Sequence, residues 1–425
     1  MNKLDSEIVR ARLADSGFEF TSHADEADLI LFVTCSVREH AETRVMSRLG
    51  SLGPLCRARP GLIVGVLGCM AQRLGAEIAQ RFPHVRIVCG TRAFPHIAEM
   101  AAEAARSREP VIRLDEDFPE VEPNRNPAHR PSRYCAYVCA ARGCDNWCAY
   151  CVVPALRGPQ ISRPPRDIIR ESEALVADGV VEITLLGQNI DSYGRDLKNG
   201  YGLADLLEHI NSIPGLLRLR FITSHPKDLD PRIIEAVARL DKVCNHLHMP
   251  PQSGSNRILK LMNRGYTREH YLDLVRRLRE TVPDIAIAGD FIVGFPGETE
   301  EDFQASLDLL RQVRFQQCFI FKYSNRPGTR AEKMPDQVPE EVIIQRHQIL
   351  LKEQERISLE KHTAMIGQRV EVLVEGPSRK KSEMFMGRTT RNELVIFPAE
   401  TAMAGRIIPI RIQEATPVAM YGVPE

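Results

Sequence analysis

Three closely spaced cysteines carry the most distinctive chemistry in this chain. Cys144, Cys148 and Cys151 stand at the spacing C-x3-C-x2-C. Three thiolates can ligate three irons of a [4Fe–4S] cluster, which leaves the fourth iron open to a substrate or cofactor. A structural zinc site needs four closed ligands, and no second cysteine pair at such a spacing follows. Three neighbouring cysteines cannot all pair with one another in disulfides, and no secretory context appears. The spacing therefore indicates an iron–sulfur cluster with one open iron.

The composition is that of a globular protein from a reducing compartment. The chain has 425 residues, of which 43% are hydrophobic and 26% charged, so two or three domains are expected. Its 56 basic residues balance its 56 acidic ones, so only a local patch could attract nucleic acid. There is no secretory signal and no apolar run of membrane-spanning length. With an odd number of cysteines, 11, the chain is expected to be cytoplasmic and independent of membranes.

Residues 1–105 are predicted to form a parallel α/β domain, because apolar runs alternate with helical patterns. The predicted strands are 29–34, 62–67 and 85–88. Cys35 and Cys69 follow the first two strands, at the edge where functional groups gather in parallel sheets. Ordinary packing of two buried thiols is the alternative interpretation.

Residues 106–132 are rich in proline and acidic residues and are predicted to be a linker. Over 133–363 strands and helices alternate again, which predicts an incomplete (β/α)6 barrel. The predicted strands are 134–140, 182–186, 217–223, 243–248, 286–293 and 318–323. The cysteine motif follows the first strand, and polar loops follow the others. Because active sites of such barrels lie at the C-terminal ends of the strands, these loops are expected around the cysteines.

Residues 364–425 show short strand patterns, which predict a small antiparallel barrel. Within this region the segment 376–391 carries five basic residues against one acidic residue. The basic residues are Arg379, Lys380, Lys381, Arg388 and Arg391. A solvated loop and a nucleic-acid contact are both compatible with this charge.

Motifs in all three regions resemble the methylthiotransferase family of radical S-adenosylmethionine (SAM) enzymes. The cysteine motif, with Tyr150 before its third cysteine, resembles the radical SAM superfamily. The words Val-Thr-Cys35-Ser-Val-Arg and Gly-Cys69-Met-Ala-Gln resemble the family's N-terminal domain. The word Glu375-Gly-Pro-Ser-Arg-Lys-Lys resembles the TRAM domain, an OB-like module that binds tRNA. The resemblance therefore implies an α/β domain, a radical SAM barrel and a TRAM barrel.

The resemblance implies SAM and two [4Fe–4S] clusters as cofactors. The three cysteines of the motif would hold the cluster that binds SAM, and Cys35 and Cys69 would be ligands of a second, auxiliary cluster. The family's first auxiliary cysteine lies in a Gly-Cys-Gln-Met-Asn word followed by Asp-Ser-Glu. This chain opens at Met1-Asn2-Lys3-Leu4-Asp5-Ser6-Glu7, so a third auxiliary ligand and the first strand are expected to be missing, through an internal start site or a truncation.

The resemblance also implies binding residues. Tyr150, Gln188, Asn189 and Ser224 would line the SAM and substrate cavity. Arg157 lies near the cysteine motif in sequence, and on that ground it is expected to meet a phosphate or the SAM carboxylate. The basic residues of 376–391 would contact tRNA. No side chain is assigned as a general acid or base, because the cofactors carry the chemistry.

The implied reaction adds a methylthio group to C2 of N6-(dimethylallyl)adenosine at tRNA position 37. The implied partners are a tRNA anticodon stem-loop, an electron donor such as flavodoxin or ferredoxin, and a donor of sulfur or clusters, and the chain is expected to act as a monomer. One alternative is methylthiolation of threonylcarbamoyladenosine or of a ribosomal protein. Another is a tRNA-binding iron–sulfur protein that lacks methylthiolation because the first auxiliary cysteine is absent.

The remaining cysteines and two histidines are expected to be structural. His246 and His248 share one face of a predicted strand, but no carboxylate at a fitting spacing supports a metal site. The cysteines expected to serve packing alone are Cys56, Cys89, Cys135, Cys139, Cys244 and Cys318.

Overall fold

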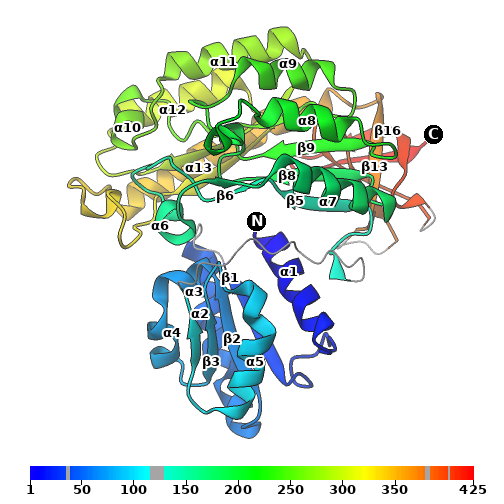
Figure 1. Cartoon of the computed structure of the whole chain (residues 1–425). Coiled ribbons are helices and arrows are strands. Elements are labelled where there is room, and N and C mark those ends of the chain that lie inside the picture. Colours follow the sequence, from blue (N-terminus) through cyan, green and yellow to red (C-terminus); the bar gives the residue numbers. More distant parts are fainter. Residues whose placement is uncertain (35–38, 115–128, 379–382, 401–402) are drawn as a thin grey trace. The chain divides into compact units, whose positions relative to one another are not determined.

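The computed structural model describes residues 1–34, 39–114, 129–378, 383–400 and 403–425 (Figure 1). The chain forms two compact units. The first contains residues 1–131 and 152–159, and the second contains 132–151 and 160–425. Among the described residues no helix is both long and apolar enough to cross a membrane. By the division into two units, the segment 152–159, which directly follows Cys151, packs with the N-terminal unit and not with the barrel.

The first unit is built on a four-stranded parallel sheet in the order β1-β2-β3-β4. Its strands are β1 (Leu29–Thr34), β2 (Ile63–Gly68), β3 (Val85–Cys89) and β4 (Val111–Arg113). One face packs against α1 (Asn2–Asp15) and α5 (Ile97–Arg106). The other packs against α2 (Glu39–Ala58), α3 (Cys69–Leu74) and α4 (Ala76–Arg81). Helices on both faces explain why the strands are apolar throughout.

Of the two predictions for this unit, the one for its strands is confirmed and the one for the linker is wrong in part. The three predicted strands are present, within one residue of their expected bounds. The predicted linker 106–132 is wrong at Val111–Arg113, because these residues pair with β3 and extend the sheet. Residues 115–128 of that linker lie outside the described residues.

The second unit contains the six predicted barrel strands, paired in parallel as β5-β8-β9 and β10-β11-β12. The strands are β5 (Cys135–Cys139), β8 (Glu182–Leu186), β9 (Arg218–Ile222), β10 (His246–His248), β11 (Ala286–Val293) and β12 (Gln317–Lys322). The main covering helices are α7 (Pro165–Ala177), α8 (Leu203–Asn211), α9 (Pro231–Arg239), α11 (Arg268–Thr281), α12 (Glu300–Val313) and α13 (Glu340–Thr363). A bridge between Leu219 and Val243 joins the two sheets. In the described chain β5 and β12 do not pair, so the barrel is incomplete.

The barrel strands turn their outward faces to the helical core and most of their charged and polar side chains inward. Outward residues pack against the helices in one large core, which includes Ile183, Leu185, Leu219, Phe221, Leu247 and Phe291. Because successive residues of a strand point to opposite faces, their neighbours face the barrel interior. These interior residues include Thr184, Arg220, His246, His248 and Asp290. The interior therefore offers polar groups to a ligand.

The C-terminal region is a closed five-stranded barrel in the order β13-β14-β15-β17-β16. Its strands are β13 (Arg369–Pro377), β14 (Phe385–Arg388), β15 (Leu394–Phe397), β16 (Ile407–Ala415) and β17 (Met420–Pro424). Alternate apolar residues fill its centre, among them Val372, Val374, Phe397 and Ile410. The predicted small barrel is confirmed. The barrel was predicted to be antiparallel, but its pair of β15 with β17 is parallel.

Two buried arginines of β9 connect the two barrels of the second unit. Arg218 donates to the carbonyl oxygens of Arg388 (2.5 Å) and Glu371 (3.2 Å). Arg220 donates to the carbonyl oxygen of Thr389 (2.6 Å) and to that of the next residue (3.0 Å). These guanidinium groups use several donors each, so the contact is directional as well as polar.

We expect Arg220→Ala to lower the free energy of unfolding of the full chain by about 3 to 5 kcal/mol. Arg220 also pairs with buried Glu182 at 3.0 Å, so the substitution leaves an unpaired carboxylate in the barrel. The measurement is chemical denaturation. The control is Arg239→Ala, which breaks an exposed pair with Glu208 and should cost less than about 1 kcal/mol. Equal effects of the two substitutions would contradict this account of the connection.

Candidate functional site

The cysteine motif forms a loop that the second unit holds by backbone hydrogen bonds. Cys144 and Cys148 are buried and Cys151 is half-buried. The Cys151 N–H donates to the Cys148 carbonyl (3.0 Å), which tightens the loop. Between these cysteines, Ala149 donates to the carbonyl of Met262 and accepts from the N–H of Ala331, both at 2.9 Å. The barrel therefore fixes the loop that carries the three thiols.

Two of the three sulfur atoms, those of Cys144 and Cys148, accept hydrogen bonds. The Asn146 N–H donates to Cys144 Sγ (3.4 Å), and Arg264 Nη1 donates to Cys148 Sγ (3.3 Å). Burial raises the pKa of the Cys144 thiol, which disfavours a free thiolate there. Hydrogen bonds to cysteine sulfurs stabilise the charge of an iron–sulfur cluster. The donor set therefore fits a [4Fe–4S] cluster at this loop.

Arg264 is one residue of this site that the sequence did not reveal. It is buried, and besides Cys148 it contacts the hydroxyl groups of Tyr150 (3.4 Å) and Tyr266 (3.1 Å). Burial works against its charge, but these neighbours raise the pKa of Arg264 well above its usual value. The guanidinium thus stays positive beside the thiols. It lies 116 positions from Cys148 in sequence, so no local spacing could point to it.

A mononuclear metal site is not formed by the described residues. Within them, no three or more side chains of His, Cys, Asp or Glu converge as a single metal ion requires. A [4Fe–4S] cluster makes no such demand, because each cysteine ligates a different iron. His248 does have a carboxylate partner, Asp290, whose Oδ1 lies 3.1 Å from His248 Nε2. That pair was not predicted, because it joins two strands.

Several buried polar atoms that lack a hydrogen-bond partner among the described residues follow three barrel strands. They are Gln188 Oε1, Asn189 Oδ1, His225 Nε2 and Gln252 Oε1. Such atoms cost about 1 to 3 kcal/mol each unless a ligand completes them. The ammonium, carboxylate and hydroxyl groups of SAM are of the kind that can do so. The predicted positions of Gln188 and Asn189 at the strand ends are compatible with SAM, although contact with it stays a prediction.

Asp228 connects the cysteine loop to the end of β8. Asn146 and Asn189 both donate to its Oδ2, at 3.0 and 2.7 Å, and Arg195 donates to its Oδ1 at 2.5 Å. Burial alone would raise the pKa of Asp228, but Asn146 and Arg195 lower it below its usual value. Asp228 therefore stays ionised and holds both amides in place.

Ser224 lies at the end of β9, where its hydroxyl donates to Asp191 (2.8 Å). Asp191 also accepts from the N–H of His225 (2.9 Å), and burial raises the pKa of Asp191 to about 7. The hydroxyl of Ser224 is thus engaged by a carboxylate in this structure. Its predicted role in lining the SAM cavity stays a prediction.

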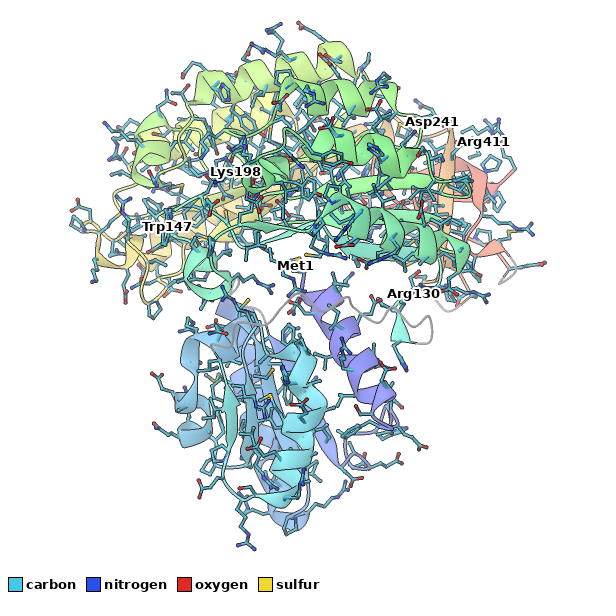
Figure 2. All side chains as sticks on the ribbon, in the orientation of Figure 1. Met1, Arg130, Trp147, Lys198, Asp241 and Arg411 are labelled. Carbon is cyan, nitrogen blue, oxygen red and sulfur yellow. The ribbon has the colours of Figure 1, made fainter. Side chains whose placement is uncertain are left out.

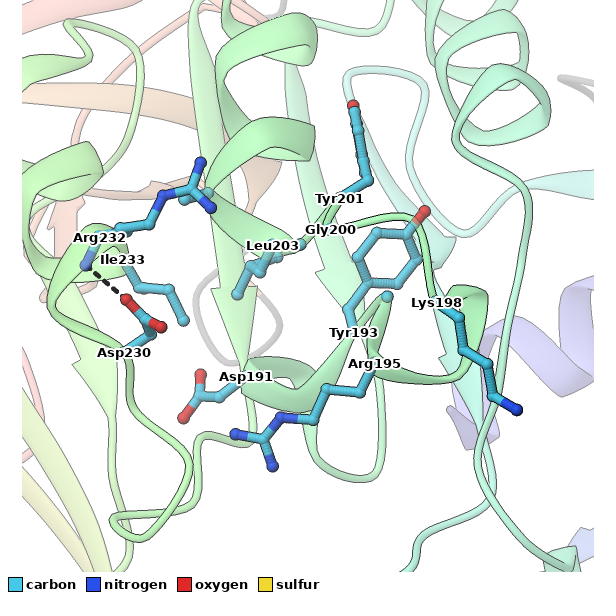
Figure 3. A pocket seen from close by; sticks show the side chains of 13 residues that line it. Asp191, Tyr193, Arg195, Lys198, Gly200, Tyr201, Leu203, Asp230, Arg232 and Ile233 are labelled. Carbon is cyan, nitrogen blue, oxygen red and sulfur yellow. Dashed lines mark hydrogen bonds between the residues drawn. The ribbon is translucent and has the colours of Figure 1, made fainter.

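A pocket of about 240 Å³ opens at Asp191 near the beginnings of α8 and α9. Figure 3 shows Arg195 beside Asp191, with Asp230 and Arg232 across the pocket. Its volume is below the roughly 300 Å³ at which cofactor pockets usually begin. Its lining has no cysteine, so we do not assign it to SAM.

Arg157 lies in α6 (Val153–Arg157) and packs in the first unit. Its Nη2 donates to Asp5 Oδ2 (2.8 Å), and both side chains are buried. Burial opposes its charge, but Asp5 and Cys69 raise the pKa of Arg157, and Cys69 is also its hydrogen-bond partner. The structure thus places Arg157 beside Cys69. Its predicted contact with a phosphate or with the SAM carboxylate stays a prediction.

The predicted auxiliary ligands follow adjacent strands of the first unit. Cys69 is buried at the start of α3, and Cys35 lies outside the described residues. The residues before them, Thr34 and Gly68, are register partners in β1 and β2. A Cβ atom on Gly68 would lie 2.6 Å from the Thr34 carbonyl oxygen, so glycine permits this close approach. The second cluster itself stays a prediction.

The predicted RNA-binding residues are only partly described. Arg379, Lys380 and Lys381 lie outside the described residues. Arg388 pairs with Glu375 (3.0 Å), and Arg391 pairs with Glu393 (3.3 Å). Their contact with RNA stays a prediction.

In the cysteine loop, Trp147 is 65% exposed at the periphery of the second unit (Figure 2).

Comparisons with known proteins match all three regions. Family models match residues 138–310 (Radical SAM superfamily), 1–90 (Uncharacterized protein family UPF0004) and 363–422 (TRAM domain). The tRNA-2-methylthio-N(6)-dimethylallyladenosine synthase of Moorella thermoacetica is 46% identical over 98% of this chain and 94% of its own length. The protein of the same name from Desulforamulus reducens is 46% identical over 99% of this chain and 92% of its own length.

Among solved structures, the radical SAM methyltransferase TsrM from Kitasatospora setae shares the fold. Its TM-score is 0.56 at 17% identity, over 77% of this chain and 74% of that one. At this identity the likeness concerns the fold alone.

We expect Arg264→Gln to make the reduction potential of the reconstituted cluster more negative by some tens of millivolts, because a charged donor to Cys148 is lost. The measurement is a redox titration followed by electron paramagnetic resonance (EPR), with iron content determined in parallel. The control is Arg257→Gln, which removes a half-exposed guanidinium from α10 (Asn256–Leu261). An unchanged potential at unchanged iron content would contradict the role of Arg264.

Proposed function

Because the chain belongs to the family of tRNA-2-methylthio-N(6)-dimethylallyladenosine synthases, which are radical SAM enzymes, we propose that it adds a methylthio group to C2 of N6-(dimethylallyl)adenosine at position 37 of tRNA. The observation that carries the proposal is the loop of Cys144, Cys148 and Cys151 at the end of the first barrel strand, with donors aimed at two of its sulfurs. The radical chemistry that a cluster with an open iron supports is the chemistry that methylthiolation of this adenine needs.

The family implies SAM and a [4Fe–4S] cluster, which together supply the radical chemistry that a strong C–H bond needs. Cys144, Cys148 and Cys151 would hold the cluster. Arg264 keeps a positive charge against the thiolate of Cys148. Asp228 holds Asn146 and Asn189 in fixed orientations, so that the loop and the end of β8 present a preorganised polar surface.

Tyr150 supports the same site without ionising. Burial raises the pKa of Tyr150 well above its usual value, so the phenol stays neutral at physiological pH. Its side chain packs against an apolar cluster that includes Met262 and Phe295, while its hydroxyl accepts from Arg264. We assign Tyr150 to positioning the loop and to lining the SAM site.

The partners follow from this function. The proposed substrate is the anticodon stem-loop, whose unpaired bases can be splayed into a pocket, and the TRAM barrel with its basic segment is the proposed tRNA contact. A second [4Fe–4S] cluster with Cys35 and Cys69 among its ligands, an electron donor such as flavodoxin or ferredoxin, a sulfur donor, a monomeric state and a cytoplasmic location complete the proposal.

We expect the anaerobically reconstituted chain, given SAM, reductant and prenylated tRNA, to form the 2-methylthio nucleoside. The measurement is mass spectrometry of the digested tRNA. The control is Cys144→Ala, which should give neither 5′-deoxyadenosine nor product, because the cluster loses a ligand. Formation of 5′-deoxyadenosine by the unsubstituted chain, without methylthiolation of prenylated tRNA, would contradict the proposed function. Methylthiolation of threonylcarbamoyladenosine tRNA alone would contradict the proposed substrate.

A further inference from the structure

One wall of the barrel interior carries an aromatic pair on β12. Cys318 and Ile320 of this strand pack outward into the helical core. Phe319 and Phe321 alternate with them and therefore face the interior. Their rings stack at 6.4 Å between centroids with an interplanar angle of 17°, and Phe319 is 40% exposed. The wall thus offers apolar surface inside an otherwise polar barrel, where a ligand could cover it.

The aromatic pair lies directly beside a carboxylate. In the parallel register of β11 and β12, Asp290 is opposite Phe319 and Ile292 is opposite Phe321. Paired residues of neighbouring strands point to the same face of a sheet, so these four side chains form one surface. His248 extends it from β10 through its contact with Asp290. The side chains of Asp290 and His248 are 20% and 18% exposed, so both are accessible.

We propose that Phe319, Phe321 and Asp290 form the subsite that recognises the prenylated N6 group of the substrate adenine; this rests on the proposed function. The dimethylallyl group is a short branched hydrocarbon, and the nitrogen that carries it keeps one N–H donor. The hydrocarbon packs against Phe319 and Phe321, and the N–H donates to Asp290. A carboxylate has two acceptor oxygens, so Asp290 can serve His248 and the substrate together.

The same wall rejects the other modified adenine. A threonylcarbamoyl group carries a carboxylate and several polar atoms. It would bring a negative charge towards Asp290 and would lose water against the rings of Phe319 and Phe321 without gaining hydrogen bonds. Unmodified adenine would leave the rings uncovered. The wall therefore selects by both an attractive and a repulsive contact, which is how related substrates are separated.

The test is equilibrium binding of three anticodon stem-loops of one sequence, carrying dimethylallyladenosine, threonylcarbamoyladenosine or unmodified adenosine. We expect the full reconstituted chain with SAM to bind the prenylated RNA about 10- to 100-fold more tightly than the unmodified one. Phe321→Ala and Phe319→Ala should each remove most of this preference and leave binding of the unmodified RNA unchanged. Asp290→Asn should weaken the discrimination against threonylcarbamoyladenosine.

The matched control is Phe20→Ala, since Phe20 is a similarly exposed phenylalanine (41%) of the first unit. It should keep the full preference. Iron content and 5′-deoxyadenosine formation without RNA show whether each variant is folded and loaded. Equal affinity of the unsubstituted chain for prenylated and unmodified RNA would overturn the subsite, as would a preference that survives in both phenylalanine variants. A preference that depends on Phe319 and Phe321, with no methylthio product, would keep the subsite and overturn the proposed function.

Discussion

The candidate site depends on the balance of charge around three thiols in one loop. Cluster thiolates are anionic, and the interior of a barrel solvates charge poorly. Arg264 provides a buried positive charge at Cys148, and a backbone N–H is directed at Cys144. Asp228 then ties Asn146 of the loop to the strand ends. Because each of these groups is itself held by other bonds, the loop is prepared for a cluster before a cofactor binds.

Because side chains alternate along the barrel strands, one face of each strand contributes to stability and the other to ligand recognition. Outward residues make the core that gives stability, and inward residues make a lumen that can recognise a ligand. Its polar groups are arranged unevenly: Arg220 lies near the C-terminal barrel, while Asp290 adjoins the aromatic pair of β12. A base with an apolar substituent matches the polarity of the surface that Asp290 and the aromatic pair form.

The features predicted from the sequence are those that depend on local patterns of spacing and periodicity. Spacing identified the cysteine motif, and periodicity identified the three folded regions and most of their strands. It could not identify Arg264 or the pair of His248 with Asp290, because these depend on which strands and loops become neighbours. Short strands such as β4 and β17 also escaped prediction, since their pairing partners stabilise them more than their own composition does. Arg157 was predicted to meet an anion, and the anion observed is Asp5.

The most direct test of the central claim is the EPR spectrum of the reduced protein with and without SAM. If Cys144, Cys148 and Cys151 hold a cluster with an open iron, SAM should change the cluster signal of the unsubstituted chain. The triple variant Cys144→Ala, Cys148→Ala, Cys151→Ala should lose the signal that responds to SAM and keep only the signal of the proposed second cluster. A signal that SAM leaves unaltered, or an identical response in the triple variant, would contradict the claim that these three thiolates build the SAM-binding site.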